Sequence, residues 1–334
     1  MNEKVTIHDV AEHANVSIAT VSRVLNELGN VKESTRDRVY QAMKEVGYQA
    51  AAQSEKMQEQ EKRILLIFVT ALGNFFTGRE LDGIIETANE EGYECVVYKL
   101  RTQKYSLEDM SALAHAVGAS GILMSLPNVP VEVMEKLAQM YPVVQFSEYA
   151  RGCDVPYVSI DDTEAGKRAV NFLIKQGCRR IAMINGPLRY KYAQGRLDGY
   201  LTALREAGIE ENPLLIVHQT EQGMDGTIAA AEHLFDTAQG MDGVFAISDL
   251  AAAAVLRVAN QRGFRVPEDL ALISFEDSDF AQVYTPSFTA IQIPAFHIGK
   301  LAARLLIDRL HGNFSSPPQI NLQINLTIRQ STSV

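Results

Sequence analysis

Several common signatures are missing from this chain, and their absence narrows its class. It has three cysteines, without the paired spacing of a disulfide framework: Cys95, Cys153 and Cys178. Reduced thiols of this kind are typical of a cytoplasm. No run of 18 apolar residues occurs, so no transmembrane helix is predicted. The opening MNEKVTIHDV also lacks the apolar segment of a secretory signal. We therefore expect a cytoplasmic protein.

Catalytic motifs are missing as well. The sequence contains no GxGxxG, GxxxxGK[ST], GxSxG or HExxH. Its histidines show no metal-ligand spacing, so we expect no metal. The acidic pair Asp161-Asp162 could in principle serve acid–base chemistry, but no nucleophile or phosphate-binding loop accompanies it. We therefore expect neither an enzyme nor a cofactor.

The balance of charge is acidic over the whole chain. The net charge is −10; residues 1–62 carry 8 Lys and Arg against 10 Asp and Glu, and residues 63–334 carry 23 against 31. An acidic body discourages non-specific contact with nucleic acid and leaves such binding to a local surface. The length of 334 residues predicts two or three domains, and a hydrophobic content of 46% is ample for buried cores.

Residues 5–48 have the pattern of three short helices with a sharp turn before the second. Thr6 is a plausible N-cap of the first helix, because its hydroxyl group can accept from a free backbone N–H. Asn15 tolerates a left-handed turn, and Ser17 then caps the second helix. The third helix follows Ser34 as its cap. This order is typical of a helix-turn-helix DNA-binding domain.

The second helix has an apolar side and a side free to contact a partner. Its inward residues are Val21, Val24 and Leu25. Its outward residues are Ile18, Ala19, Ser22, Arg23 and Asn26. Ile18 and Ala19 can contact a thymine methyl group, whereas Arg23 can form paired hydrogen bonds with a guanine.

A generic three-helix module is the alternative, and the net charge of −2 over residues 1–62 supports it. However, a recognition helix needs only a few donors at base edges and several phosphate contacts. Arg23, flanked by Lys32, Arg36 and Arg38, can supply these without a basic average.

The strings DVAEHANVSIATVSRVLN, VKESTRDRV and GY resemble the headpiece of the lactose-repressor (LacI/GalR) family of bacterial transcription regulators. The resemblance continues over essentially all 334 residues. It implies a headpiece at residues 1–48, a hinge at 49–62, and an effector-binding and dimerisation domain at 63–334. Together with the helix faces, it nominates these DNA-binding residues: Thr6, Ser17, Ile18, Ala19, Thr20, Ser22, Arg23, Asn26, Asn30, Lys32, Thr35 and Met57.

From Arg63 onward, short apolar runs alternate with amphipathic helical stretches. The runs include RILLIFV, YECVVYKL, GILMS, RIAMING, GVFAIS and ALISFED. Strands alternating with helices predict an α/β fold with parallel sheets covered on both faces. Two sets of such units suggest two similar lobes, with a ligand in the crevice outside the carboxyl ends of the strands.

This organisation resembles the two-lobed periplasmic-binding-protein-like body of the same family. The resemblance implies a first lobe of about 63–160 and 293–318, and a second lobe of about 162–290 and 320–334. The chain would cross between them near Ser159–Asp162, Ile291–Ile293 and Pro317–Ile320.

Polar and aromatic residues at predicted strand ends form the candidate effector site. Any one of them could instead cap a helix or link the lobes, so the prediction rests on their convergence. The string GRLDGY resembles the family segment that carries an effector-binding arginine, which is Arg196 here. The family usually has Asp where Glu276 stands, which puts the details of hydroxyl recognition in doubt. The candidates are Phe75, Phe76, Ser147, Glu148, Asp161, Tyr190, Tyr192, Arg196, Ser248, Asp249 and Glu276.

The hinge departs most from the family. Ala50 and Ala51 occupy positions where relatives usually carry Pro-Asn, and Met57 falls where a leucine wedges into the minor groove. A methionine can also unstack bases and kink DNA. The stretch AAAQSEKMQEQEK has high helical propensity, so the alternative is a solvated helical linker.

The sequence therefore predicts an operator-binding regulator, a repressor by resemblance, that works as a homodimer on a pseudo-palindromic duplex. A small-molecule effector, a sugar or nucleoside, would bind between the lobes; the stretch from PVVQFSEY to GRLDGY resembles the nucleoside-responsive branch. The alternative is a solute-binding protein without DNA-binding function. Residues 1–48 argue against that alternative.

Overall fold

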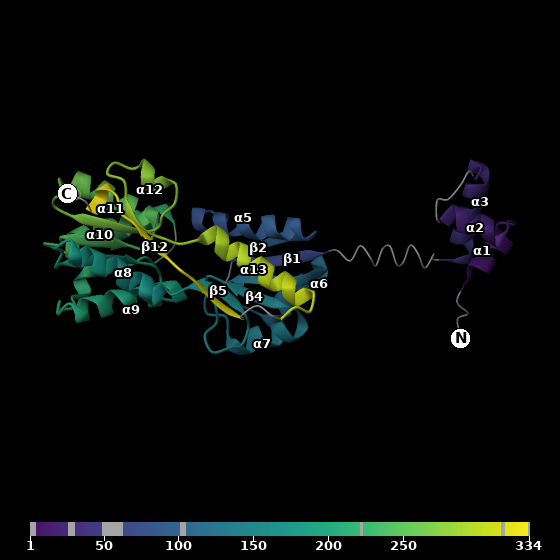
Figure 1. The fold of residues 1–334 in the computed structure, drawn as a ribbon, viewed down its shortest axis with the longest axis horizontal. Coiled ribbons are helices and arrows are strands. Elements are labelled where there is room, and N and C mark those ends of the chain that lie inside the picture. Colours follow the sequence, from purple (N-terminus) through teal and green to yellow (C-terminus); the bar gives the residue numbers. More distant parts are fainter. Residues whose placement is uncertain are drawn as a thin grey trace. The chain divides into compact units, whose positions relative to one another are not determined.

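The computed structural model describes residues 5–25, 31–48, 63–100, 105–220, 223–314 and 318–332. The chain divides into two compact units, residues 1–63 and 64–334 (Figure 1). No helix in the described part of the chain is long and apolar enough to span a bilayer.

The first unit contains the three predicted helices: α1 (Ile7–His13), α2 (Ile18–Leu25) and α3 (Glu33–Val46). Their inward side chains form one small core, which includes the buried Val10, Val21 and Val39. Because each short helix has only one apolar stripe, the three must pack against one another to bury it.

Local chemistry sets the ends of these helices. The Asp9 carboxylate accepts hydrogen bonds from the backbone N–H (2.7 Å) and the hydroxyl group (2.8 Å) of Thr6, which fixes the start of α1. Asn15 adopts the expected left-handed conformation, with φ of 49°. Ser17 Oγ accepts from the Thr20 N–H at 3.2 Å at the start of α2. The expected cap of α3 was wrong: Ser34 lies inside the helix, whose N-cap is Lys32 without a side-chain hydrogen bond.

The second unit alternates strands and helices through two lobes. The first lobe contains β1 (Ile64–Val69), α5 (Phe75–Glu90), β2 (Glu94–Lys99), α6 (Leu107–Val117), β3 (Ala119–Ser125), α7 (Val131–Met140), β4 (Val143–Phe146) and β5 (Tyr157–Ile160). The chain returns to it as α13 (Ala295–Leu310) and β11 (Gln319–Leu322). Its sheet has the order β11-β5-β4-β3-β1-β2.

The second lobe contains α8 (Asp162–Lys175), β6 (Ile181–Asn185), α9 (Lys191–Glu206), β7 (Ile216–His218), α10 (Met224–Thr237), β8 (Gly243–Ala246), α11 (Asp249–Gln261), β9 (Ala271–Glu276), α12 (Phe280–Val283), β10 (Thr289–Gln292) and β12 (Asn325–Thr327). Short 3₁₀ turns lie at Pro213–Leu215 and Gln330–Thr332. Its sheet has the order β12-β10-β9-β8-β6-β7. Only β12 among the described strands pairs antiparallel, with β10.

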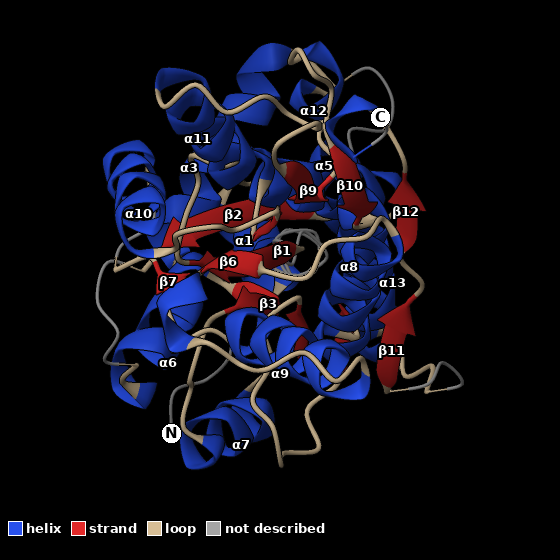
Figure 2. Cartoon of the chain, turned by 90° about the vertical axis from the view of Figure 1, so that its left-hand side faces the viewer, coloured by secondary structure: helices blue, strands red, loops and turns tan. Residues whose placement is uncertain are grey.

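Both sheets are therefore mainly parallel, and helices lie on both of their faces (Figure 2). The predicted α/β fold is confirmed. Because such strands are covered on both sides, they read as continuous apolar runs rather than as alternating ones. All but the first residue of β1, for example, are buried.

One crossing between the lobes differs from the expectation. Residues 319–322 form β11, which pairs in parallel with β5 in the first lobe. The third crossing therefore lies at Gln323 and Ile324, after the predicted position. Pairing with a strand more than 150 residues earlier decides this placement, and local sequence carries no signal for it.

Helices α5 and α13 pack closely through glycines on the first lobe. A Cβ atom at Gly83 would overlap the backbone oxygen of Phe296, and one at Gly299 would overlap that of Glu80. The two backbones approach too closely for any side chain at these positions. This contact places α5, which carries Phe75 and Glu80, against α13.

Candidate DNA-binding and effector sites

Helix α2 has the surface expected of a recognition helix. Ile18, Ala19 and Arg23 are exposed, while Val21 and Val24 are fully buried. Arg23 forms no ion pair with any described residue, so its guanidinium group is available to a partner. This surface offers one forked donor and two small apolar contacts, as predicted.

The other predicted DNA contacts divide into three groups. Thr6, Ser17 and Lys32 are exposed at helix starts, although Thr6 and Ser17 also serve as caps. Partly buried positions are Thr20, Ser22 and Thr35. Outside the described residues lie Asn26, Asn30, Met57 and the rest of the hinge at 49–62.

In the second unit, direct hydrogen bonds join the two lobes where strands end. Glu148 follows β4 in the first lobe, and its carboxylate accepts from the backbone N–H groups of Lys191 (2.8 Å) and Tyr192 (3.1 Å) at the start of α9. Lys191 Nζ in turn donates to Ser159 Oγ of the first lobe at 2.9 Å. A carboxylate at a helix N-terminus is electrostatically favoured because the free amides point toward it. The predicted Glu148 is thus part of an interlobe link.

Arg196 lies at the centre of a buried network in the second lobe. Its Nε donates to Asp162 Oδ1 at 3.0 Å, and its Nη1 donates to the carbonyl of Ile247 at 3.1 Å. The guanidinium plane lies 3.5 Å from the ring centroid of Phe275 and 4.9 Å from that of Tyr192. Two aromatic faces and a carboxylate therefore fix the orientation of this arginine.

Asp162 is the anion on which this network depends. Its Oδ2 accepts from Lys191 Nζ at 2.6 Å, and its Oδ1 accepts from Arg196. Burial acts to raise the pKa of Asp162, but the charges of Lys191 and Arg196 outweigh it and hold the pKa below its usual value. Asp162 therefore stays ionised and forms ion pairs with both buried cations.

The predicted Asp161 has a different role from its neighbour. It is exposed and caps α8 through a 3.0 Å hydrogen bond from the Glu164 N–H. It also lines a cavity of about 230 Å³ together with Tyr149, Asp162 and Lys191. A sequence pattern cannot say which of two adjacent acids at a helix start faces inward.

Three further carboxyl groups, those of Glu80, Glu276 and Asp249, interact electrostatically and have no cationic hydrogen-bond partners among the described residues. Burial, together with the charges of Glu148 and Glu276, raises the pKa of Glu80 to about 8, although a hydrogen bond from Ser147 lowers it in part. Burial and the charge of Asp249 raise the pKa of Glu276 to about 8, against the opposing charge of Arg196. At neutral pH these two glutamates are mainly protonated and can donate hydrogen bonds.

Asp249, which follows Ser248 at the start of α11, is buried and tied to the strand beside it. Its carboxylate accepts from Ser274 Oγ (2.6 Å) and from the Ser278 N–H (2.7 Å). Burial raises its pKa, and these hydrogen bonds oppose the rise. Ser248 itself caps α11 through a 3.1 Å bond from the Ala251 N–H. Asp249 and Ser248, both predicted effector contacts, are therefore hydrogen-bonded to neighbouring protein groups in the structure.

Aromatic side chains from both lobes also meet. Phe75 at the start of α5 packs edge-to-face on Phe280 of α12, with ring centroids 4.4 Å apart. Both rings remain substantially exposed, at 58% and 43%. Phe76 instead packs against the hydrophobic core. Of the predicted pair, only Phe75 lies at an interlobe contact with a free ring face.

Tyr190 and Tyr192 stack on each other at 5.2 Å between ring centroids, and Tyr190 is buried.

The backbone is strained at several residues near strand ends: φ is positive at Ser147 (54°), Glu276 (97°) and Asp277 (57°). Such conformations cost free energy in non-glycine residues and concentrate at functional sites. The strained residues therefore lie at the carboxyl ends of β4 and β9, where the candidate effector residues were predicted.

Sequence reasoning missed several residues of this site. Glu80 had one available signal, since it lies four residues after Phe76 and thus on the same face of α5. Lys191 had none, because a lysine among polar residues is normally exposed. Phe280 lies in a segment that was not assigned to the site.

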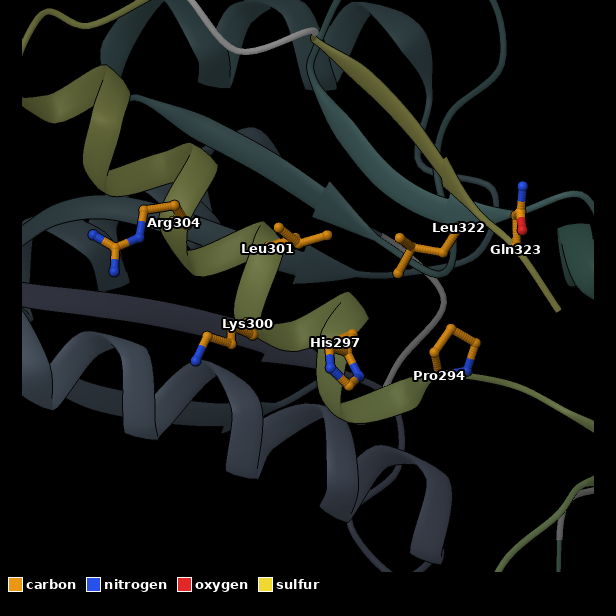
Figure 3. Close-up of a pocket in the computed structure, with 7 residues that line it drawn as sticks. All are labelled: Pro294, His297, Lys300, Leu301, Arg304, Leu322 and Gln323. Carbon is orange, nitrogen blue, oxygen red and sulfur yellow. The ribbon is translucent and has the colours of Figure 1, made fainter. Parts of the chain in front are cut away.

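A larger cavity, of about 530 Å³, lies elsewhere on this unit (Figure 3). It is formed by one side of α13 and by the segments that cross between the lobes. None of the predicted effector residues lines it. The lining residues are Pro294, His297, Lys300, Leu301, Arg304, Leu322 and Gln323. The described residues contain no cluster suited to hold a metal ion.

Comparison with known proteins agrees with this geometry. Residues 6–50 match the model of bacterial regulatory proteins of the lacI family, and residues 170–332 match a periplasmic binding protein-like domain. The HTH-type transcriptional repressor CytR of Escherichia coli is 33% identical over 328 residues, which are 98% of this chain and 96% of that protein. The chain belongs to the lacI family.

Other members and solved structures extend this likeness. The regulator CelR of Thermobifida fusca is 32% identical over 341 residues, with 98% of each chain covered. A transcriptional regulator CelR–cellobiose complex superposes with a TM-score of 0.73 at 32% identity, covering 98% of this chain and 99% of that one. A lac repressor dimer bound to operator superposes with a TM-score of 0.75 at 20% identity, covering 99% and 100%, which shows the shared fold. This lacI-family member is therefore a DNA-binding transcriptional regulator.

Proposed function

We propose that this lacI-family chain is a repressor whose affinity for its operator is controlled by a sugar or nucleoside bound between the two lobes. We also propose that it acts in the cytoplasm as a homodimer on a pseudo-palindromic site. The observation that carries the proposal is the direct link between the lobes. Glu148 of one lobe binds the N-terminus of α9 in the other, beside Arg196. A ligand that entered there would have to change this contact.

Three side chains near the interlobe contacts would suit an uncharged polar ligand with a ring. Glu80 and Glu276 are protonated donors at neutral pH, and Phe75 presents an exposed ring. Two relatives support the sugar class by their names: the CelR–cellobiose complex and a ribose operon repressor of Halalkalibacterium halodurans, which is 27% identical over 332 residues. The resemblance to CytR and the nucleoside-responsive branch supports the nucleoside class.

Control requires that the effector bind the operator-competent and operator-released states with different affinity. The relative orientation of the lobes is the natural variable, since the hydrogen bonds of Glu148 and Lys191 cross between them. We propose that the effector acts as an inducer, so that its binding changes the lobe arrangement and lowers operator affinity.

The test begins with selection of bound duplexes from a random library by the full-length protein at about 0.15 M salt, since phosphate contacts make affinity salt-dependent. A recovered palindrome is expected because two headpieces on a two-fold axis read two half-sites. Fluorescence anisotropy on that duplex then follows release by cellobiose, ribose and the common nucleosides. A folded dimer that enriches no sequence, with or without these compounds, contradicts the DNA-binding proposal.

Enrichment without release or tightening by any of these compounds contradicts the effector class alone. The variant Arg196→Lys separates the response to the effector from DNA binding. It keeps the charge but loses the forked contact with Asp162 and Ile247. This variant should bind the selected duplex normally and lose its response to the effector.

A further inference from the structure

Two buried polar atoms without hydrogen-bond partners lie near the boundary between the lobes, and neither belongs to a predicted effector residue. They are Tyr105 Oη, just before α6 in the first lobe, and Arg189 Nε, just before α9 in the second. Tyr105 is only 8% exposed. Among the described residues neither atom has a partner, although most buried polar groups in proteins do. Each such group therefore requires an explanation.

The surroundings show that these atoms belong to one place. The charges of Glu148, Tyr190 and Arg189 all act on the Tyr105 hydroxyl. The Arg189 guanidinium lies 5.0 Å from the ring centroid of Tyr190. The Glu148 carboxylate is already occupied by the backbone N–H groups of Lys191 and Tyr192. Tyr105 and Arg189 therefore approach the lobe boundary from opposite lobes, close enough to interact electrostatically, and neither atom takes part in the hydrogen bonds of Glu148.

The chemistry of the two atoms defines what could satisfy them. Arg189 Nε–H is a donor only, whereas the Tyr105 hydroxyl can donate and accept. Burial, with the charges of Tyr190 and Glu148, raises the pKa of Tyr105 to about 12 despite the opposing charge of Arg189, so the phenol keeps its proton. One group that meets both needs is an alcohol oxygen, which accepts from Arg189 and exchanges a hydrogen bond with Tyr105. An ammonium group would be repelled by the arginine and cannot accept from it.

We propose that Tyr105 and Arg189 form a specificity-determining subsite for a hydroxyl group on the sugar ring of the effector, either a free sugar or the ribose of a nucleoside. This inference rests on the proposed function and assigns to it two residues that the sequence did not nominate. Because both atoms are shielded from solvent, the ring hydroxyl reaches them only when the lobes move apart. Occupation of the subsite therefore changes the lobe arrangement directly.

The test compares Tyr105→Phe with the wild-type full-length protein. Tyr98→Phe is the matched control, because Tyr98 is a 43% exposed residue of β2 in the same lobe. Without ligand, Tyr105→Phe should unfold at the same temperature as wild type or higher, since it removes an unpaired buried hydroxyl. The ligands tested by thermal shift and calorimetry are D-ribose, cellobiose and adenosine. For the one that binds, analogues lacking one hydroxyl each then identify the contacted group.

Tyr105→Phe should bind that ligand about tenfold more weakly, the usual order for loss of one net hydrogen bond. The analogue without the contacted hydroxyl should bind wild type and Tyr105→Phe equally. Arg189→Lys, which keeps the charge and removes Nε, should show a similar loss. Tyr98→Phe should change neither stability nor affinity.

Equal affinity of wild type and Tyr105→Phe for a ligand that binds would overturn the subsite and leave the proposed function intact. Marked destabilisation of ligand-free Tyr105→Phe would also overturn it, because the hydroxyl would then have a partner in the free protein. If none of the three compounds raises the unfolding temperature, the proposed effector class and the subsite are rejected together. Binding of ribose but not adenosine identifies the effector class as a free sugar. Binding of adenosine but not ribose identifies it as a nucleoside.

Discussion

Replacement of Glu80 by glutamine tests the electrostatics of the interlobe site directly. Burial and the nearby charges of Glu148 and Glu276 raise the pKa of Glu80 from 4.5 to about 8. Between these values the folded protein holds a proton that the unfolded chain has released. The free energy of unfolding must therefore fall as pH rises through this window, by about 1.4 kcal/mol per pH unit for one such group.

From pH 5 to pH 7 this single carboxyl should cost the wild-type protein about 3 kcal/mol. Glu80→Gln has nearly the same shape, can still bond Ser147 Oγ, and does not ionise. Its stability should therefore fall less steeply, and the difference from wild type should grow by about 3 kcal/mol over the same interval. Contributions from Asp162 and Asp249, which do not act on the pKa of Glu80, are common to both proteins and largely cancel in the difference.

Urea unfolding at a series of pH values measures this difference. The chain has no tryptophan, so far-UV circular dichroism follows the transition. Glu90→Gln, an exposed position on the same helix, controls for the loss of a surface carboxylate. Parallel pH curves for wild type and Glu80→Gln would refute the reasoning, because they would show that Glu80 is ionised in the folded protein at neutral pH.

Two further predictions concern the headpiece and the first lobe. Arg23→Ala should weaken operator binding by roughly 1–3 kcal/mol and relax the base preference at one symmetric position of the operator. Arg36→Ala should instead weaken binding to all duplexes equally, and the same result for Arg23→Ala would show that Arg23 contacts phosphate. Gly299→Ala should destabilise the protein by about 1–3 kcal/mol in urea unfolding, because its Cβ would overlap the Glu80 carbonyl oxygen and force α5 and α13 apart. Gly78→Ala, at an open position of α5, should instead be neutral or stabilising by up to about 1 kcal/mol. Equal losses of unfolding free energy in the two variants would contradict the packing argument.

The headpiece was largely predictable because its signals are local. A turn residue that accepts positive φ, a hydroxyl cap and an apolar stripe all lie within a few residues of one another. Asn15, Ser17 and Val21 therefore indicated the start and the buried side of α2. The start of α3 failed at Ser34 because capping ability is common to many serines, and the backbone there enters the helix at Lys32 without side-chain help.

The position of the candidate effector residues was only partly predictable. Glu148, Arg196 and Glu276 were nominated because they were predicted at strand ends or by resemblance, and their role as effector contacts remains a proposal. The sequence did not reveal that Asp162 rather than Asp161 pairs with the buried cations, since adjacent residues at a helix start differ only in direction. It also did not reveal Lys191 or Glu80, whose burial depends on contacts with distant segments.

The class of this protein, a helix-turn-helix headpiece followed by an α/β body of two lobes, follows from the sequence alone. Such features depend on periodicity, caps and run length, which a chain carries locally. The folded chain was needed to show that β11 pairs with β5, that α5 and α13 meet through glycines, and that Tyr105 Oη and Arg189 Nε are buried without described partners. Each of these depends on residues far apart in the chain, whose mutual approach fixes burial, charge balance and hydrogen bonding.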